Sequence, residues 1–263
     1  MILSSEITAH QVEIAERIIW TLTFASQLIL LVVLIGRDRV RRYPWFTTGI
    51  VFSALTLMAE VLLSGRMAML PLQEILISLG DLSAIVGLMV VVEAAWQAFA
   101  GAPRAQWIAN TAGLLVVSGG VLTVMGPWPM WKKLSLDLPM MKLYLMQFFG
   151  RKIELLAALL IIGVGILVAI FGRSFKAGWR SHTQSIVIGL AAVGASVLAR
   201  EIVFNLTMHS ARSDVKVMHQ RLGFAFGHEI IYVAALVWWI VWLWRDEPGS
   251  AAATKEAIPQ TSE

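Results

Sequence analysis

The chain has 263 residues, of which 58% are hydrophobic and only 14% are charged, and its 21 Lys and Arg against 17 Asp and Glu give a net charge of +4. Soluble domains are about 45–50% apolar and about 25% charged. The composition therefore excludes an ordinary water-soluble globule and indicates a membrane protein.

Residue usage excludes further classes of function. The chain contains no cysteine, which rules out disulfides, thiolate metal sites, iron–sulfur ligation and cysteine nucleophiles. The pI is near 9.6, but the basic residues lie in short clusters between apolar runs, as in loops that contact lipid headgroups. We therefore expect the lipid bilayer, and not nucleic acid, as the partner of these clusters.

Apolar stretches of membrane-spanning length follow one another along the whole chain. A spanning helix needs about 20 largely apolar residues. The predicted spans are residues 15–36, 45–64, 75–99, 106–126, 146–172, 183–206 and 222–244. The predicted fold is thus all-α, a polytopic membrane protein with one seven-helix domain over residues 1–245. Residues 246–263, with their Pro, Gly, Ser and Ala, are expected to form a disordered cytoplasmic tail.

The loop after the first predicted span sets the expected orientation. Residues 36–44 contain Arg37, Arg39, Arg41 and Arg42, and the positive-inside rule places such a short basic loop in the cytoplasm. The N-terminus is then outside and the C-terminus is cytoplasmic. Basic residues in the other loops fall on both sides and do not discriminate. We expect the protein in a bacterial inner (plasma) membrane.

Ionisable residues within the predicted spans concentrate toward one surface. A charged side chain near the bilayer centre costs about 2.5–3.5 kcal/mol, so those present are expected to face the protein interior. Successive spans run in opposite directions and each residue advances about 1.5 Å along its helix. By this reckoning most of these residues lie in the outer third of the bilayer, and only Glu93 lies near the cytoplasmic end. The outer group is Glu60, Asp81, Glu154, Arg200, Glu201, His228 and Glu229.

Helical spacing aligns these residues with polar neighbours, since positions three or four apart share a face. Ser53, Thr56 and Glu60 form one stripe, and His228 shares a face with Tyr232. We predict a pocket walled by the second, third, sixth and seventh spans, with Arg200 as its fixed positive charge. Its candidate ligand-binding residues are Glu60, Asp81, Arg200, Glu201, His228, Glu229 and Tyr232, and the candidate metal ligands are His228, Glu229 and Asp81.

The same residues also have purely structural interpretations. An intramembrane Arg such as Arg200 is more often part of an interhelical ion pair than of a ligand clamp. Glu60 and Glu154 lie near helix ends and can reach the headgroups. His228 can simply be hydrogen-bonded to a neighbouring helix. Clustering of the group is stronger support for a pocket than any one member.

Known sequence signatures do not identify the chain or a cofactor. A retinal protein needs a Schiff-base lysine in its last span, and no Lys occurs between Arg221 and Arg245. The segment His228-Glu229-Ile230-Ile231-Tyr232 begins like the zinc motif H-E-x-x-H but has Tyr232 in place of the second histidine. No Walker loop or dinucleotide fingerprint is present.

The leading hypothesis is a non-enzymatic, sensor-like protein that binds a small polar or cationic ligand in the outer pocket. A separate cytoplasmic partner would be required, because the chain has no recognisable output domain. Two alternatives are a membrane-embedded hydrolase, whose divalent metal on His228 with Asp81, Glu201 or Glu229 activates water, and an ion- or proton-coupled carrier. A fourth is a structural membrane component with a satisfied polar core.

Overall fold

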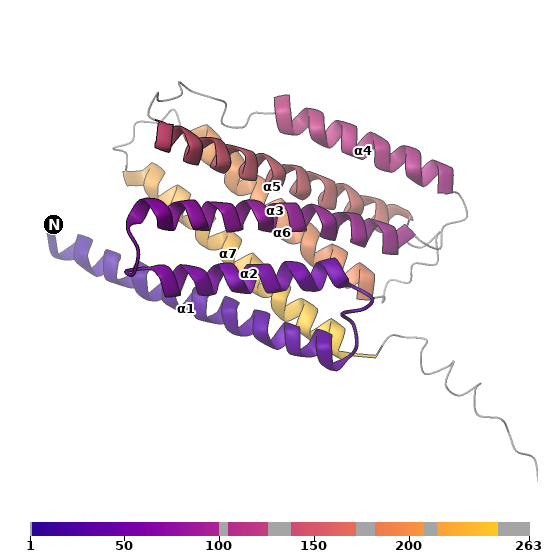
Figure 1. The fold of residues 1–263 in the computed structure, drawn as a ribbon, viewed down its shortest axis with the longest axis horizontal. Helices are drawn as coiled ribbons and strands as arrows, with labels where there is room; N and C mark the ends of the chain where they lie inside the picture. Colours follow the sequence, from indigo (N-terminus) through magenta and orange to yellow (C-terminus); the bar gives the residue numbers. More distant parts are fainter. Residues whose placement is uncertain (1, 100–104, 126–137, 172–181, 208–214, 247–263) are drawn as a thin grey trace, which may run out of the picture.

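The computed structural model is an all-helical bundle (Figure 1). It describes residues 2–99, 105–125, 138–171, 182–207 and 215–246, and within these ranges there is no strand. The helices are α1 (Ile2–Gly36), α2 (Pro44–Leu63), α3 (Met69–Phe99), α4 (Ala105–Met125), α5 (Leu138–Phe171), α6 (His182–Thr207) and α7 (Val215–Trp244). All of the predicted tail beyond Asp246 lies outside the described residues.

Six of the helices in the described ranges are long and apolar enough to cross a membrane. They are α1, α2, α3, α5, α6 and α7, and α4 contributes a shorter apolar stretch, Gly113–Met125. A bundle of this kind is consistent with a multi-pass integral membrane protein, because a helix satisfies its own backbone hydrogen bonds in lipid. The prediction of an all-helical membrane chain is confirmed at this level.

Several helices begin earlier than the predicted spans. The helices α3, α5 and α7 begin six to eight residues before them, and α1 begins at Ile2 instead of residue 15. Hydropathy marks the apolar stretch and not the helix, so charged residues that end the stretch can still be helical. Pro139 is compatible with the early start of α5 because it lies in the first turn, where a missing N–H leaves no hydrogen bond unmade.

The bundle is a ring of six helices with the seventh outside. Around the ring, α1 packs on α2, α2 on α3, α3 on α5, α5 on α6, α6 on α7, and α7 on α1. An additional contact joins α3 to α6 across the ring. Figure 1 shows α4 beyond α5, at the margin of the bundle. Chain order therefore differs from ring order at one place, where α5 follows α3.

Two kinds of contact attach α4 to α5. Gly119 lets Leu160 and Leu156 approach closely, because a methyl group there would lie within 3.5 Å of both side chains. Lys152 Nζ donates to the Thr123 carbonyl at 2.6 Å, in the last turn of α4 where carbonyls lack helical partners. Most of the other apolar side chains of α4, including Leu114, Val117 and Met125, remain exposed.

Polar contacts tie the ring together at the end where α2 begins. The Glu93 carboxylate accepts hydrogen bonds from the backbone N–H groups of Trp45 at 3.2 Å and Phe46 at 2.8 Å, which are first-turn donors of α2. Arg37, after α1, forms an ion pair with Asp246, after α7, at 2.9 Å. The loop between α1 and α2 and the end of α7 therefore lie at the same end of the bundle.

Tight packing of α6 on α7 fixes the centre of the ring. The Trp239 indole is 1% exposed, donates to the Ser185 carbonyl at 3.2 Å and meets Phe46 edge-on with centroids 5.0 Å apart. It lies over Gly189, where a methyl group would stand 2.6 Å from Cε2 of the indole. Only glycine leaves room for the ring at this position.

Replacing Gly189 by alanine is expected to destabilise the protein. Overpacking of a tight core costs about 1–3 kcal/mol, so Gly189→Ala should lower the midpoint of thermal unfolding in detergent. The control is Gly223→Ala on α7, where a methyl group meets nothing within 4 Å and better helix propensity gives at most about 1 kcal/mol of stabilisation. Equal midpoints for the two variants would contradict the packing described.

Candidate functional site

A cavity of about 580 Å³ lies within the ring. It is lined by residues of α2, α3, α5, α6 and α7 and by Thr23 of α1. The sequence predicted four of these walls, but α5 is a fifth one that it missed. A volume between about 300 and 1,000 Å³ is the usual size of a small-molecule site.

The part of the cavity nearer the start of α2, called the inner part here, is apolar. Its walls include Phe46, Ile50, Val90, Val91, Ile161, Leu190, Val193 and Trp239. Phe46 and Trp239 belong to the buried cluster that joins α1, α2, α3, α6 and α7. An apolar body of a ligand would therefore be surrounded on several sides by side chains that cannot form hydrogen bonds.

The outer part is polar and carries the charges. Four of the seven predicted ligand-binding residues line the cavity: Asp81 on α3 and His228, Glu229 and Tyr232 on α7. Gln147, Arg151 and Glu154 of α5 line it as well. Gly150 of α5 leaves room for the Asp81 carboxylate of α3, which occupies the space that a Cβ would need. The Asp81–Gly150 pair was not visible in the sequence.

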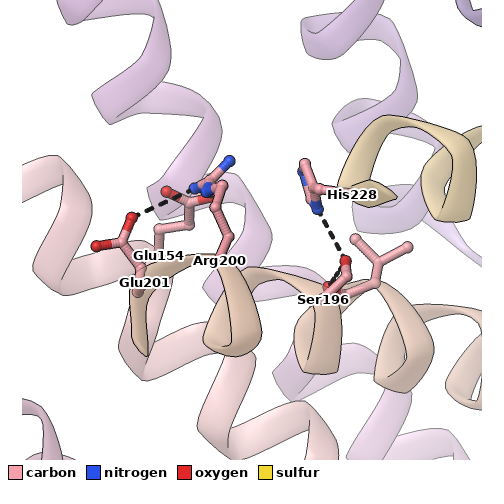
Figure 2. Close-up of polar contacts among 6 residues, drawn as sticks. Glu154, Ser196, Arg200, Glu201 and His228 are labelled. Carbon is pink, nitrogen blue, oxygen red and sulfur yellow. Dashed lines mark hydrogen bonds and ion pairs between the residues drawn. The ribbon is translucent and has the colours of Figure 1, made fainter. Parts of the chain in front are cut away.

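The other three predicted residues lie away from the cavity lining. Glu60 is exposed, one turn from the end of α2. Arg200 and Glu201 belong to an ion-pair cluster instead, in which Arg200 Nη2 lies 3.1 Å from Glu154 and 3.6 Å from Glu201 (Figure 2). Among the described residues, the predicted fixed cation pairs with the cavity lining at Glu154, and its charge also acts on His228 and Glu229.

The ion-pair cluster contains two carboxylates and one cation. The Glu201 side chain is 6% exposed, against 30% for Arg200 and 38% for Glu154. One oxygen of Glu201, Oε2, is buried with no hydrogen-bond partner in the described part of the chain. Lys152 also interacts electrostatically with Glu201, but Arg200 is the cation that forms an ion pair with it. Removing Arg200 would therefore leave a buried carboxylate without its ion-pair partner.

His228 is held by a serine on the neighbouring helix. Its Nδ1 lies 2.8 Å from the Ser196 hydroxyl, which itself donates to the Val193 carbonyl at 2.6 Å (Figure 2). The imidazole joins α7 to α6, which in turn packs on α5. This contact agrees with the structural interpretation of His228, but it uses only one of the two ring nitrogens.

A neutral polar network, which sequence analysis missed, joins α1, α2 and α7. Gln27 is fully buried, and its Nε2 donates to Ser53 at 2.7 Å and to Tyr232 at 3.1 Å. Ser53 and Tyr232 share a further hydrogen bond of 3.2 Å. A glutamine within an apolar stretch was the available signal, but its partners lie on two other helices and only the ring order reveals them.

Metal ligation has no support in the described residues. Among them, no three His, Asp or Glu side chains come together as they would need to do to hold a metal ion. His228, Glu229 and Asp81, the candidate ligands, line one cavity without forming such a group. The metal-dependent alternative therefore has no three-ligand group to rest on among the described residues.

Comparisons with known proteins do not extend the assignment. No protein-family model matches the chain, and neither a curated protein nor a solved structure matches it. The chemistry of the cavity is therefore the basis for assigning a function.

Arg200→Met is expected to destabilise the protein by about 2–3 kcal/mol, because Glu201 loses its neutralising neighbour. This is below the 3–5 kcal/mol of a fully buried pair because solvent reaches Arg200 and Glu154. Adding Glu201→Gln should recover most of the loss, as measured by urea or thermal unfolding in detergent. Strictly additive effects of the two substitutions would show that Arg200 and Glu201 are not coupled.

Proposed function

We propose that this protein is a non-enzymatic, sensor-like membrane receptor that binds a small cationic ligand in the central cavity. The observation that carries this proposal is a pair of carboxylates, Asp81 and Glu229, which line the cavity and have no ion-pair partner in the described part of the chain. Unpaired carboxylates within a membrane protein are costly, and a cationic ligand would offset that cost.

The cations nearby are already engaged. Arg200 pairs with Glu154 and Glu201. The Arg151 guanidinium lies over the Phe204 ring, 5.4 Å from its centroid, and Lys152 donates to the end of α4. These contacts leave Asp81 and Glu229 as the charges most accessible to a ligand. The apolar inner wall supports a ligand with a hydrocarbon or aromatic body.

We also propose that all seven helices cross the membrane, with the N-terminus outside and the C-terminus in the cytoplasm of a bacterial inner membrane. The pairing of Arg37 with Asp246 supports a common side for the basic loop and the end of α7. Residues 1–245 would then be one transmembrane domain and residues 246–263 a cytoplasmic tail. A ligand-induced change would be relayed to a separate cytoplasmic partner at the basic loop.

Single-cysteine labelling tests the orientation, because the chain has no cysteine of its own. In spheroplasts, a membrane-impermeant maleimide should label Arg66→Cys, between α2 and α3, and should label Arg41→Cys only after lysis. Both positions are exposed in the structure. Labelling of Arg41→Cys before lysis would invert the proposed topology.

Binding of cationic ligands can be measured by calorimetry on the protein in lipid nanodiscs. We expect at least one amine from a panel of alkyl and arylalkyl ammonium ions to bind more tightly than the alcohol with the same carbon skeleton. Asp81→Asn or Glu229→Gln should weaken binding about tenfold to a hundredfold, since a hydrogen bond to a charged group contributes about 1.5–3 kcal/mol.

The matched control is Glu16→Gln, which neutralises an exposed carboxylate on α1 outside the cavity lining and should leave affinity unchanged. The proposal fails if no amine binds better than its alcohol, or if Glu16→Gln weakens binding as much as Glu229→Gln does.

A further inference from the structure

The hydrogen bonds of Ser196 define which nitrogen of His228 carries a proton. A serine hydroxyl has one hydrogen, and Ser196 donates it to the Val193 carbonyl at 2.6 Å, because a carbonyl can only accept. The Ser196 oxygen, 2.8 Å from His228 Nδ1, must then accept the hydrogen of an Nδ1–H group. In the neutral imidazole the second nitrogen, Nε2, consequently carries a lone pair.

This lone pair is available on the wall of the cavity. His228 lines the cavity, and its Nε2 has no hydrogen-bond partner in the described ranges of the chain. Solvent can reach Nε2, because this atom is not buried as the sealed unpartnered atoms of the bundle are. The carboxylates of Asp81 and Glu229 line the same cavity. These three groups are all hydrogen-bond acceptors.

A hydroxyl pair elsewhere in the cavity lining also has a free hydrogen. Ser53 and Tyr232 line the cavity and share one hydrogen bond, which uses one of their two hydroxyl hydrogens. Gln27 donates to both oxygens, so it accepts neither hydrogen through these contacts.

We infer that the ligand is a protonated amine bearing N–H groups, one of which donates to Nε2 of His228 while Glu229 and Asp81 balance its charge. This inference rests on the proposed function and narrows it. A quaternary ammonium ion carries the same charge but has no N–H to donate, so charge recognition alone would admit it and hydrogen bonding to His228 would not. The donor requirement therefore discriminates between two subclasses of cation.

A pair of probes with one carbon skeleton tests this inference. We would measure binding of 2-phenylethylammonium and of its N,N,N-trimethyl derivative to the full-length protein in nanodiscs. The primary amine should bind about tenfold or more tightly than the trimethyl compound. In His228→Phe, which keeps a ring but removes the acceptor, this preference should disappear while the affinity for the trimethyl compound stays within about twofold.

Ser196→Ala provides a second variant that leaves the imidazole in place. It frees His228 to adopt either neutral tautomer, and the preference for the primary amine should fall by about twofold to fivefold. Nitrogen-15 NMR of histidine-labelled protein should show the Nδ1–H tautomer for His228 in the wild type and a mixture in Ser196→Ala. This readout does not depend on ligand binding or on the folding of His228→Phe.

The outcomes separate the inference from the proposed function. Equal affinities of the two probes for the wild type would overturn the inference and leave a cation receptor in place. A preference that persists in His228→Phe, or an Nε2–H tautomer in the wild type, would overturn it as well. Failure of every ammonium probe, quaternary ones included, to bind better than its neutral analogue would overturn the proposed function itself.

Discussion

The cost of placing charge in a hydrocarbon environment is the constraint that organises this molecule. It is large enough that each ionisable side chain in a spanning helix needs a partner, an exit to the headgroups or a polar cavity. Glu93 satisfies it by accepting hydrogen bonds from the first turn of α2, and Glu154 and Glu201 satisfy it around Arg200. Asp81 and Glu229 have no ion-pair partner in the described residues, and both line the cavity. They are the two charges on which the proposed site depends.

The ring of six helices brings these carboxylates to one cavity. Because α3 and α5 are neighbours, Asp81 on one and Glu154 on the other reach the same cavity as His228 of α7. Gly150 and Gly189 permit the two closest approaches, of a carboxylate in one case and of an indole in the other. The indole closes the inner part with apolar surface, and the carboxylate belongs to the polar outer part. A cavity with these two parts suits an amphipathic cation.

Hydropathy predicted the helices because apolar length is a local property of the sequence. Helix alternation likewise predicted that Glu154 and Arg200 lie at one depth, and the two form an ion pair. Neighbours around the ring were not predictable, since α4 is as apolar as the helices that enclose the cavity. Without ring order, neither the wall formed by α5 nor the network of Gln27, Ser53 and Tyr232 could be derived. Spacing along one helix shows which residues share a face, but not what that face meets.

The position of α4 beside α5 has a consequence for chain direction. Figure 1 shows α3 and α5 side by side, running the same way through the bundle, which two consecutive helices joined by a short loop cannot do. The intervening helix, α4, runs in the opposite direction, and none of its described residues lines the cavity. Its contribution is direction: because α4 runs back along the bundle, α5 runs the same way as α3 (Figure 1). A chain without α4 would have α5 antiparallel to α3, with Arg151, Glu154 and His228 displaced from Asp81.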